Sequence, residues 1–588
     1  MTKFPLCSVR ERRVADHWRD AGRRFCEFEL VAFLNFLKYP STILQRSQGI
    51  IRTCRYICYG DFSSLQQKHI QSANELPIQG TKFQKYLGNM ANVTRRRVFY
   101  KTLTLKPNTE MRELWSTFPV PLDFKIYLFN VTNPTEVTAG EKPIVEEIGP
   151  FFYDEYKHKV NMVDREEDDS LEYNLKATWF FNPSLSSPLT GEEELVFPHV
   201  LILSMVKLTL EQQPAAIGIL SKYKAVDNIF KKPSSVFVRA KAREILFDGV
   251  PLDCTGKDFA SSAICNVLKE KDDALLPDGP GRYLFSLFGP KNGTVLPDRI
   301  RVLRGVKYWK DVGKVTEVNG KPELDIWTED QCNEFNGTDS TIFAPLLTEQ
   351  DDIVSFSPDI CRSLSARFDR INTYHYKADL GDMSTNPKEK CFCPAPDNCL
   401  TKNLMDLTKC VGAPLIASLP HLLGAEEKYL EMVDGLHPDE EKHGIGMDFE
   451  PMTATPLIAH KRLQFNMFLQ KVEKFKLMKN FPECLFPFFW VEEGIELGGE
   501  FLAKLKMVFK MISIIGFMKW LTIISGACVS GAAAAMFFKN KDKGSLDVTK
   551  VTPQSAANGK NEDEKKWPNQ MTISTIQSAA VPPNLDAN

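Results

Sequence analysis

Six cysteines lie close together between residues 332 and 410, and their chemistry is the most distinctive in the chain. Their thiols could pair as disulfides or bind a zinc ion. The tightest pair, Cys391-Phe-Cys393, is closer than the about two to four intervening residues of ordinary zinc sites, and no histidine stands beside it. We therefore favour three disulfides over zinc, although spacing alone does not fix which cysteine pairs with which. The six are Cys332, Cys361, Cys391, Cys393, Cys399 and Cys410.

Sequence motifs that carry catalysis are absent. There is no GxSxG elbow, P-loop, HExxH or Rossmann glycine triplet. The nine histidines are scattered, and we expect His421 and His460 to be buried in the core. The acid pairs Glu440-Glu441 and Glu492-Glu493 are expected on solvated faces. We therefore predict a protein that is not an enzyme and has no cofactor or metal; an esterase triad assembled from distant positions is the alternative.

A long apolar run near the C-terminus predicts a membrane-spanning helix that anchors the rest. Residues 511–538 carry one charge, Lys519, and the 19 residues from Trp520 to Phe538 carry none. These would form a helix of about 28 Å, close to the thickness of a hydrocarbon core. Three lysines follow at once, which marks the cytosolic side. We expect the segment before residue 500 to be extracellular, and residues 539–588, rich in polar residues, to be a disordered cytosolic tail.

Between residues 103 and 500 the pattern predicts a β framework with a helical insertion. Alternation of apolar and polar residues favours strands at 122–134 and 171–181, and another after the turn at 148–150. Later strands are expected at 282–288, 302–308 and 374–376. Apolar residues recur at helical spacing over 195–247, where Ser234-Ser235 is expected to cap a helix over 236–247. The acidic run 164–169 is expected to be a solvated hairpin tip.

Bulk composition indicates a globular protein with a large apolar interior. Hydrophobic residues make up 43% of the chain, 40 residues are Phe, and the net charge of −2 shows no nucleic-acid footprint. Residues 1–95 differ from the rest because they are basic, and their best apolar run, Leu30 to Leu37, is too short to cross a bilayer. They also lack a signal-peptide pattern. We expect this segment not to be the natural N-terminus and to be poorly ordered.

Short motifs in a fixed order from about Leu103 to Lys539 resemble the family of class B scavenger receptors and lysosomal integral membrane proteins. Within it, the insect sensory neuron membrane proteins are the most similar group. The motifs are Met111-Arg-Glu-Leu-Trp115, Pro121-Leu-Asp-Phe-Lys-Ile-Tyr-Leu-Phe-Asn130, Glu147-Ile-Gly-Pro150, Leu171-Glu-Tyr-Asn174, Phe288-Gly-Pro-Lys-Asn-Gly-Thr294, Asp359-Ile-Cys-Arg362, Cys391-Phe-Cys393, Ser418-Leu-Pro-His421 and Lys461-Arg-Leu-Gln464.

The resemblance implies an α+β fold, namely an antiparallel β-barrel ectodomain with an apical helical bundle at about residues 195–247. It also implies an internal apolar tunnel that carries lipidic ligands toward the bilayer, and a transmembrane helix at each end of the chain. Residues 1–95 depart from this pattern, since they contain nothing like the family's first helix.

The resemblance also implies functional residues. Ligands or their carriers would dock on the apical lysines Lys222, Lys224, Lys231 and Lys232, of which the last two align best; ordinary surface lysines are the alternative. The family's disulfide pattern implies the pairs Cys332–Cys391, Cys361–Cys410 and Cys393–Cys399. Cys254 and Cys265 lie outside this set and either pair or stay free.

By the same resemblance we expect a non-enzymatic plasma-membrane receptor that captures lipid-derived odorants such as fatty-acid pheromones. It would receive them from an odorant-binding protein and pass them to an odorant receptor subunit. A general lipid or lipoprotein scavenger receptor in non-sensory tissue is the alternative. The tail lacks the acidic dileucine signal of lysosomal members. Four sequons are expected glycosylation sites, the last two being the better placed in turn-like sequence: Asn92, Asn130, Asn292 and Asn336.

Overall fold

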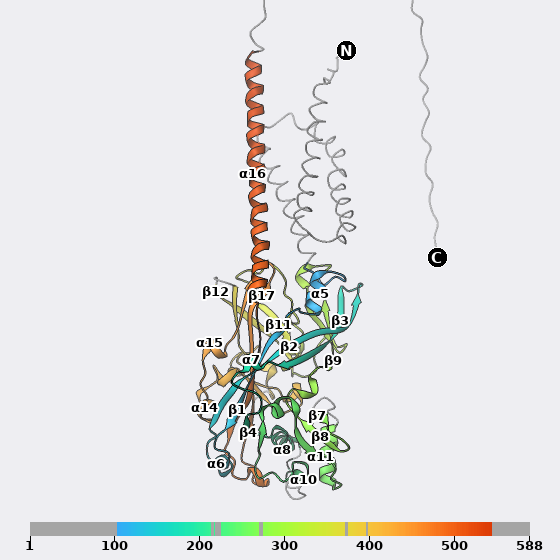
Figure 1. The fold of residues 1–588 in the computed structure, drawn as a ribbon, viewed down its shortest axis with the longest axis vertical. Helices are drawn as coiled ribbons and strands as arrows, with labels where there is room; N and C mark the ends of the chain where they lie inside the picture. Colours follow the sequence, from blue (N-terminus) through green and yellow to red (C-terminus); the bar gives the residue numbers. More distant parts are fainter. Residues whose placement is uncertain are drawn as a thin grey trace, which may run out of the picture. The chain divides into compact units, whose positions relative to one another are not determined.

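The structure is a computed structural model that describes residues 103–543 apart from 213, 215–216, 218–224, 270–274, 371–373 and 396–397. The chain divides into two compact units, one ending at Glu496 and the other beginning at Leu497. All strands of the described residues belong to the first unit (Figure 1). In the second unit the described residues form one long helix, α16 (Gly499–Lys543).

One antiparallel sheet dominates the first unit. Its main path runs β10-β9-β3-β2-β1-β18-β17-β16-β13-β12-β11, with β15 joined to β17 and β14 to β15. Its centre is built from both ends of the unit, since β1 pairs with β18 from Asp123–Gly494 to Leu128–Phe489. The strands are β1 (Leu122–Val131), β2 (Val145–Arg165), β3 (Ser170–Phe181), β9 (Val295–Leu303), β10 (Val315–Val318), β11 (Ile353–Ser357), β12 (Arg362–Arg370), β13 (Tyr374–Ala378), β14 (Leu404–Asp406), β15 (Ile416–Ser418), β16 (Ile445–Glu450), β17 (Thr455–Leu469) and β18 (Cys484–Glu496).

The two edges of this sheet meet at Gly337 and Thr338, which nearly close it into a barrel. Val315 in β10 donates its N–H to the Gly337 carbonyl at 3.0 Å, and Thr338 donates to the Val354 carbonyl of β11 at 3.0 Å. Gly337 has φ +83°, and a Cβ on it would lie 2.1 Å from the Val354 carbonyl oxygen, so glycine is required there. Closure removes exposed strand edges, and it confirms the predicted antiparallel barrel.

Alternating burial explains why the first strands could be predicted. In β1 the side chains of Phe124, Ile126 and Leu128 are buried, whereas Lys125 and Tyr127 are half-buried. The strands expected after residue 150 and at 171–181 correspond to β2 and β3. The strand expected at 302–308 is wrong, because β9 ends at Leu303 and the chain turns through residue 305 with φ +74°.

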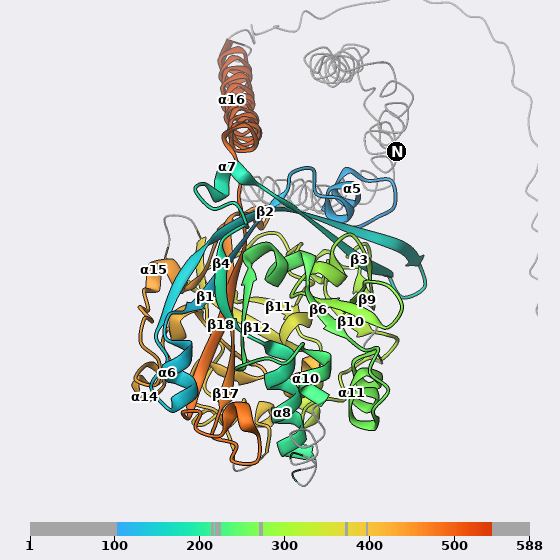
Figure 2. The same cartoon turned by 60° about the horizontal axis from the view of Figure 1, so that its bottom comes forward.

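Two helices and one two-stranded sheet make up the region at 195–247 that was predicted as apical helices, and a second small sheet follows it in the chain. The helices lie near one another in Figures 1 and 2. The helices are α8 (Val200–Gln212) and α10 (Ala225–Ile229), and α11 (Phe259–Lys269) lies nearby. Strand β4 (Glu194–Pro198) pairs with β5 (Phe237–Lys241), and β6 (Val250–Asp253) with β8 (Arg282–Phe285) and β7 (Leu275–Pro277).

The helix expected over 236–247 is wrong. Phe237 and Ala240 of β5 are buried while Arg239 is exposed, because β5 lies against β4 as a strand. The Ser235 hydroxyl accepts the N–H of Phe237 at 3.2 Å, so it forms a turn before a strand instead of capping a helix. Only the end of the range is helical, as the short π-helix η3 (Glu244–Asp248).

The cysteines form four disulfides. Three join the pairs implied by the resemblance, Cys332–Cys391, Cys361–Cys410 and Cys393–Cys399, and the fourth joins Cys254 to Cys265. Cysteines 332, 391 and 393 lie in a buried cluster of their own beside Trp327 and Phe392. The paired sulfurs leave no zinc ligand set in this region of the described residues.

The hairpin tip at 164–169 is only partly solvated, contrary to expectation. Asp164 pairs with Arg112 at 3.0 Å and with Arg304 at 3.3 Å, and Asp169 is 5% exposed. These two acids at either end of the run therefore anchor the hairpin to neighbouring chain.

Within α16, residues Ser513–Met536 are long and apolar enough to cross a membrane, with mean hydropathy 1.5. This confirms the C-terminal apolar helix. Residues 1–95 and the tail beyond 543 lie outside the described residues. The remaining helices are short: α5 (Glu110–Ser116), α6 (Pro134–Ala139), α7 (Pro183–Ser186), η4 (Gly289–Lys291), η5 (Trp309–Asp311), α12 (Asp330–Asn333), η6 (Pro358–Ile360), η7 (Lys390–Phe392), α13 (Thr408–Val411), η8 (Pro420–Leu422), α14 (Glu427–Leu430), α15 (Glu440–His443) and η9 (Lys476–Met478).

Candidate ligand site inside the barrel

Five aromatic side chains from distant parts of the sequence meet inside the first unit, and we call them the aromatic belt: Phe124, Trp179, Phe247, Phe288 and Phe489. Phe288 is central, with ring centroids 5.5 Å from Phe124, 5.8 Å from Phe247 and 5.9 Å from Phe489. Trp179 lies 5.6 Å from Phe124. All five belong to one large apolar cluster or pack against it. The belt is a continuous apolar surface of the kind that a hydrocarbon chain can cover.

Strands β1, β3 and β18 carry three members of the belt, while η3 and the turn before η4 bring Phe247 and Phe288 onto them. This turn passes very close to η3, because a Cβ on Gly289 would lie 2.2 Å from the Phe247 carbonyl oxygen. Asn292 then fixes the backbone of Trp179, accepting its N–H at 2.9 Å and donating to its carbonyl at 3.3 Å. Local backbone contacts therefore hold the belt together.

Charged side chains continue the same face of the sheet beyond the belt, and Asp359 joins them from η6. We call this group the charged recess: Glu155, Lys157, Asp359, Lys461 and Glu493. In the register, Phe124 lies opposite Glu493, and Glu493 opposite Lys461; such directly opposed residues share a face. Lys157 reaches Glu493 at 2.7 Å and Glu155 at 3.5 Å, and Lys461 reaches Asp359 at 2.7 Å.

The recess is deep, yet parts of it stay accessible. Burial acts to lower the pKa of both lysines. Even so, 22% of the Lys157 side chain and 37% of the Lys461 side chain are exposed. Asp359, which lies in η6, keeps 59% of its side chain exposed, so the recess is open to the surface there. Glu155 is the exception, since it is only 1% exposed, and burial raises its pKa to about 7.

The recess also controls the charge of its members. The ammonium of Lys461 lowers the pKa of Asp359 to about 2. Burial alone would lower the pKa of Lys157, but Glu155 and Glu493 raise it above its ordinary value. Each lysine of the recess is therefore charged and already paired with a carboxylate.

A second polar cluster could be mistaken for a metal centre. One ligand atom each of Glu147, His421 and His443 lie within 4.8 Å of one another. Both rings, however, accept backbone N–H groups at Nδ1, from His437 and Asp439, each at 3.0 Å. A neutral ring that accepts at Nδ1 carries its proton on Nε2, so these rings offer donors and not lone pairs.

The His421 ring uses this donor on Glu147 at 2.5 Å, and Trp490 Nε1 donates to the same carboxylate at 2.7 Å. These contacts lower the pKa of Glu147 against the opposing effect of its burial. Among the described residues, no hydrogen bond joins a histidine ring to a serine, threonine or cysteine side chain. The cluster is therefore a structural hydrogen-bond network, as expected for the buried His421.

The acid pair at 492–493 is not on a solvated face, which corrects our expectation. Glu492 is 4% exposed and accepts from Lys125 and from Arg462, both at 2.6 Å. Glu493 belongs to the charged recess. His460, expected to be buried, keeps 30% of its side chain exposed. Both acids belong to β18, where adjacent side chains point to opposite faces, so Glu492 is paired on one face of the sheet and Glu493 on the other.

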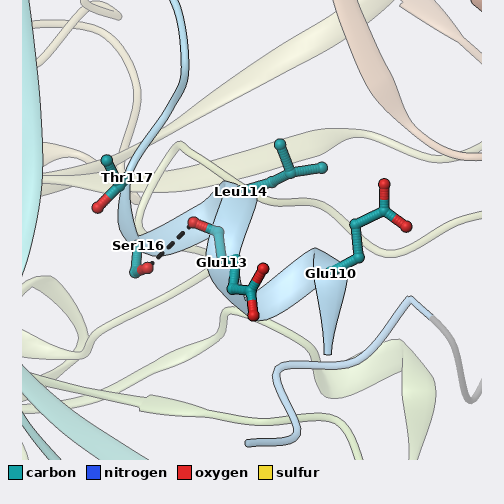
Figure 3. A pocket seen from close by; sticks show the side chains of 5 residues that line it. All are labelled: Glu110, Glu113, Leu114, Ser116 and Thr117. Atoms are coloured by element: carbon teal, nitrogen blue, oxygen red, sulfur yellow. Dashed lines mark hydrogen bonds between the residues drawn. The ribbon is translucent and has the colours of Figure 1, made fainter. Parts of the chain in front are cut away.

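Two smaller hollows lie elsewhere. Next to α8, a cavity of about 10 Å³ is lined by His199 and apolar side chains such as Phe197, Val238 and Phe285. A wider hollow of about 350 Å³ lies against α5, where Glu110, Glu113, Leu114, Ser116 and Thr117 line it (Figure 3). Its only side-chain hydrogen bond in Figure 3 runs from the Ser116 hydroxyl to the Glu113 carbonyl at 3.0 Å. Neither hollow presents a reactive constellation.

Of the four apical lysines singled out from the sequence, Lys231 and Lys232 are exposed and Lys222 and Lys224 lie outside the described residues. Lys231 and Lys232 have φ values of 57° and 56°, an uncommon backbone conformation for two successive non-glycine residues. A second lysine group, in the loop between β17 and β18, was missed. Lys474, Lys476 and Lys479 are exposed there, as is Lys471, which pairs with Glu473 at 3.3 Å.

A signal for this loop does exist in the sequence. Buried apolar residues recur every third position, at Val472, Phe475, Met478 and Phe481, and pin the loop to the core. The loop adjoins the apical region, because the rings of Phe481 and Phe237 lie 6.1 Å apart. This three-residue repeat distinguishes a loop that packs on the core and exposes its lysines from a loop that is simply charged and solvated.

The sequons are in different environments. The side-chain amide of Asn292 accepts from the backbone N–H of Trp179 and donates to its carbonyl. The side-chain amide oxygen of Asn130 (Oδ1) accepts the backbone N–H of Val196 at 2.9 Å. Asn336 is exposed, and its backbone N–H donates to the Ser363 hydroxyl at 3.0 Å. Asn92 lies outside the described residues. Glycosylation at these positions stays a prediction.

Comparison with known proteins gives a consistent assignment. The profile of the CD36 family matches residues 84–537. Sensory neuron membrane protein 1 of Apis mellifera is 82% identical over 494 residues, which cover 83% of this chain and 94% of that protein. Proteins of the same name from Manduca sexta and Ostrinia furnacalis are 42% and 40% identical, each over 83% of this chain and 93% of the relative.

Proposed function

This chain belongs to the CD36 family, and from that premise we propose that it is a membrane receptor of insect sensory neurons. It captures lipid-derived odorants, fatty-acid pheromones among them, and passes them through the barrel interior to an odorant receptor. The printed names of its relatives support a sensory membrane role. The single observation that carries the transfer mechanism is the aromatic belt on the inner face of the sheet.

Physical chemistry makes such a path sufficient without catalysis. Each buried CH₂ group of a lipid contributes roughly 0.8 kcal/mol, so a long chain gains affinity from a covered apolar surface alone. The belt and its surrounding cluster supply that surface, and the recess beyond it supplies polarity for a head group. The tunnel that joins them to the outside is part of the proposal.

Capture would begin at the apical end. Lys231 and Lys232 follow α10, and Lys474, Lys476 and Lys479 lie in the loop between β17 and β18, which approaches this region through Phe481 and Phe237. We take these five exposed lysines as one positive surface. Such a surface attracts an acidic carrier, for which an odorant-binding protein is our candidate, and speeds its encounter. Lys222 and Lys224 would belong to the same surface.

The apolar helix would hold the receptor in the plasma membrane. Ser513–Met536 is the candidate span, and the lysines that follow it favour a cytosolic tail. The barrel would then be extracellular, where its four disulfides are stable. A scavenger receptor in other tissue would share this design, and expression confined to antennae would exclude it.

Binding of a fluorescent long-chain fatty acid to the full chain in nanodiscs tests the proposal. We expect saturable binding in the micromolar range or tighter. Replacing the five described lysines by alanine should slow loading from an acidic carrier protein while leaving equilibrium affinity unchanged. The matched control is Lys388→Ala with Lys390→Ala, an exposed pair elsewhere on the barrel. No saturable binding by a folded, disulfide-bonded receptor would refute the capture of fatty acids.

A further inference from the structure

Two buried polar atoms on neighbouring strands lack a hydrogen-bond partner: Nε1 of Trp179 in β3 and Oε2 of Glu155 in β2. Trp179 and Glu155 lie directly opposite each other in the register, so their side chains share one face. Only 1% of Glu155 is exposed, and its other carboxylate oxygen, Oε1, lies 3.5 Å from Lys157 Nζ. Buried polar groups are almost always paired, so two orphans side by side require an explanation.

The position of the pair is informative, because it lies where the aromatic belt meets the charged recess. Trp179 is a member of the belt, with centroids 5.6 Å from Phe124 and 6.1 Å from Phe288. Glu155 is a member of the recess. A molecule lying on the belt would therefore have its end beside an indole N–H donor and a carboxyl oxygen.

The charges that face this point disfavour an anion. Glu155, Glu493 and Asp359 are carboxyl groups, while Lys157 and Lys461 are already engaged at 2.7 Å with Glu493 and Asp359. Lys291 acts on Asp359 from farther away. A carboxylate entering here would meet like charges without an unpaired ammonium among the described residues of the recess. An uncharged oxygen would meet a donor and an acceptor at no such cost.

We propose that Trp179 and Glu155 form the head-group site for an uncharged oxygenated lipid, a long-chain alcohol or its ester or aldehyde, whose chain lies on the aromatic belt. The Trp179 N–H donates to the lipid oxygen, and a hydroxyl in turn donates to Glu155. This inference rests on the proposed lipid function and narrows it, because fatty acids would bind less tightly than neutral lipids of equal length.

Three probes of equal chain length test this site on the full chain in phosphatidylcholine nanodiscs: tritiated hexadecanol, hexadecane and palmitate. We expect hexadecanol to bind tightest. Trp179→Phe keeps an aromatic ring but removes the N–H, and should weaken hexadecanol roughly five- to tenfold more than it weakens hexadecane, because both probes lose the same apolar contact with the indole. Glu155→Gln keeps a hydrogen-bonding oxygen and removes the charge, so it should keep hexadecanol binding and improve that of palmitate.

Trp309→Phe, in the distant η5 helix, is the matched control and should change nothing. Equal losses of hexadecanol and hexadecane in Trp179→Phe would mean that the indole only packs, and would overturn the head-group site. So would affinities for all three probes that stay the same in both variants, as expected if a water molecule occupies the pair. Wild-type receptor that binds none of the three probes would instead overturn the lipid function itself.

Discussion

At the scale of single residues, the sheet is unusual for the charged side chains that are buried on both of its faces. Glu492 is held by Arg462 and Lys125, and Glu155 stays nearly inaccessible beside Lys157. Burying such groups is costly unless each is paired, and removing one partner exposes that cost. The polar residues therefore stabilise the fold only as complete networks, which gives direct tests by substitution.

Breaking the Glu492 network should be more harmful than replacing it. Arg462→Met removes a partner whose side chain is 10% exposed from a carboxylate that is 6% exposed, and we expect a loss of roughly 3 kcal/mol in unfolding free energy. Adding Glu492→Gln removes the uncompensated charge and should restore part of that loss. Denaturant unfolding measures both. Glu440→Gln is the exposed-acid control, and a double variant as unstable as the sum of its single changes would contradict this account.

Stability should also depend on pH through His199. Burial lowers the pKa of this ring to about 4, whereas in the unfolded chain it is about 6.5. The unfolded state therefore binds the proton first, so stability is full above about pH 6.5 and falls as pH drops toward 4, by roughly 1.4 kcal/mol per pH unit.

The variant His199→Leu cannot bind this proton. When the pH is lowered from 7 to 5, the unfolding free energy of wild type should therefore fall by roughly 2 kcal/mol more than that of the variant. Urea titrations at several pH values measure the gap. Parallel curves for the two proteins would show that the ring is not held neutral by its surroundings.

At the scale of elements, pairing with neighbouring strands determined the secondary structure wherever the sequence pattern did not predict it. Val236, Phe237 and Val238 were compatible with a helix or a strand, and the pairing of β5 with β4 selected the strand. Likewise, residues 302–308 contain apolar residues but hold a turn, because β9 reaches its pairing limit at Leu303. Strands β1 and β3 needed no such information, since their alternation already matched one buried face.

The Cys254–Cys265 disulfide is an element-scale feature with its own test. It closes a segment of 11 residues across the start of α11, and Cys265 is 2% exposed. Replacing both cysteines by serine should cost roughly 2–4 kcal/mol. Thermal unfolding measures the loss, and Cys528→Ser, an exposed free thiol, is the control. An unchanged melting temperature would mean that this bridge contributes nothing to the apical region.

At the scale of the whole molecule, the antiparallel barrel, its implied disulfide pairs and the C-terminal apolar helix could be anticipated, chiefly through resemblance. The belt could not, because Phe124 and Phe489 come together only when β1 pairs with β18, the last strand of the unit. The charged recess was hidden for the same reason. Lys157 and Lys461 are ordinary polar residues until the barrel places them on one face with Glu493, where Asp359 reaches Lys461 from η6.

The account's central claim is that lipids lie on the aromatic belt. Photo-crosslinking tests it most directly, with a hexadecanol that carries a diazirine at mid-chain, added to the full chain in nanodiscs. After irradiation and digestion, mass spectrometry should find adducts on peptides that contain Phe124, Trp179, Phe247, Phe288 or Phe489, and excess unlabelled hexadecanol should suppress them. Adducts confined to Ser513–Met536 and the outer surface, without competition, would contradict the claim.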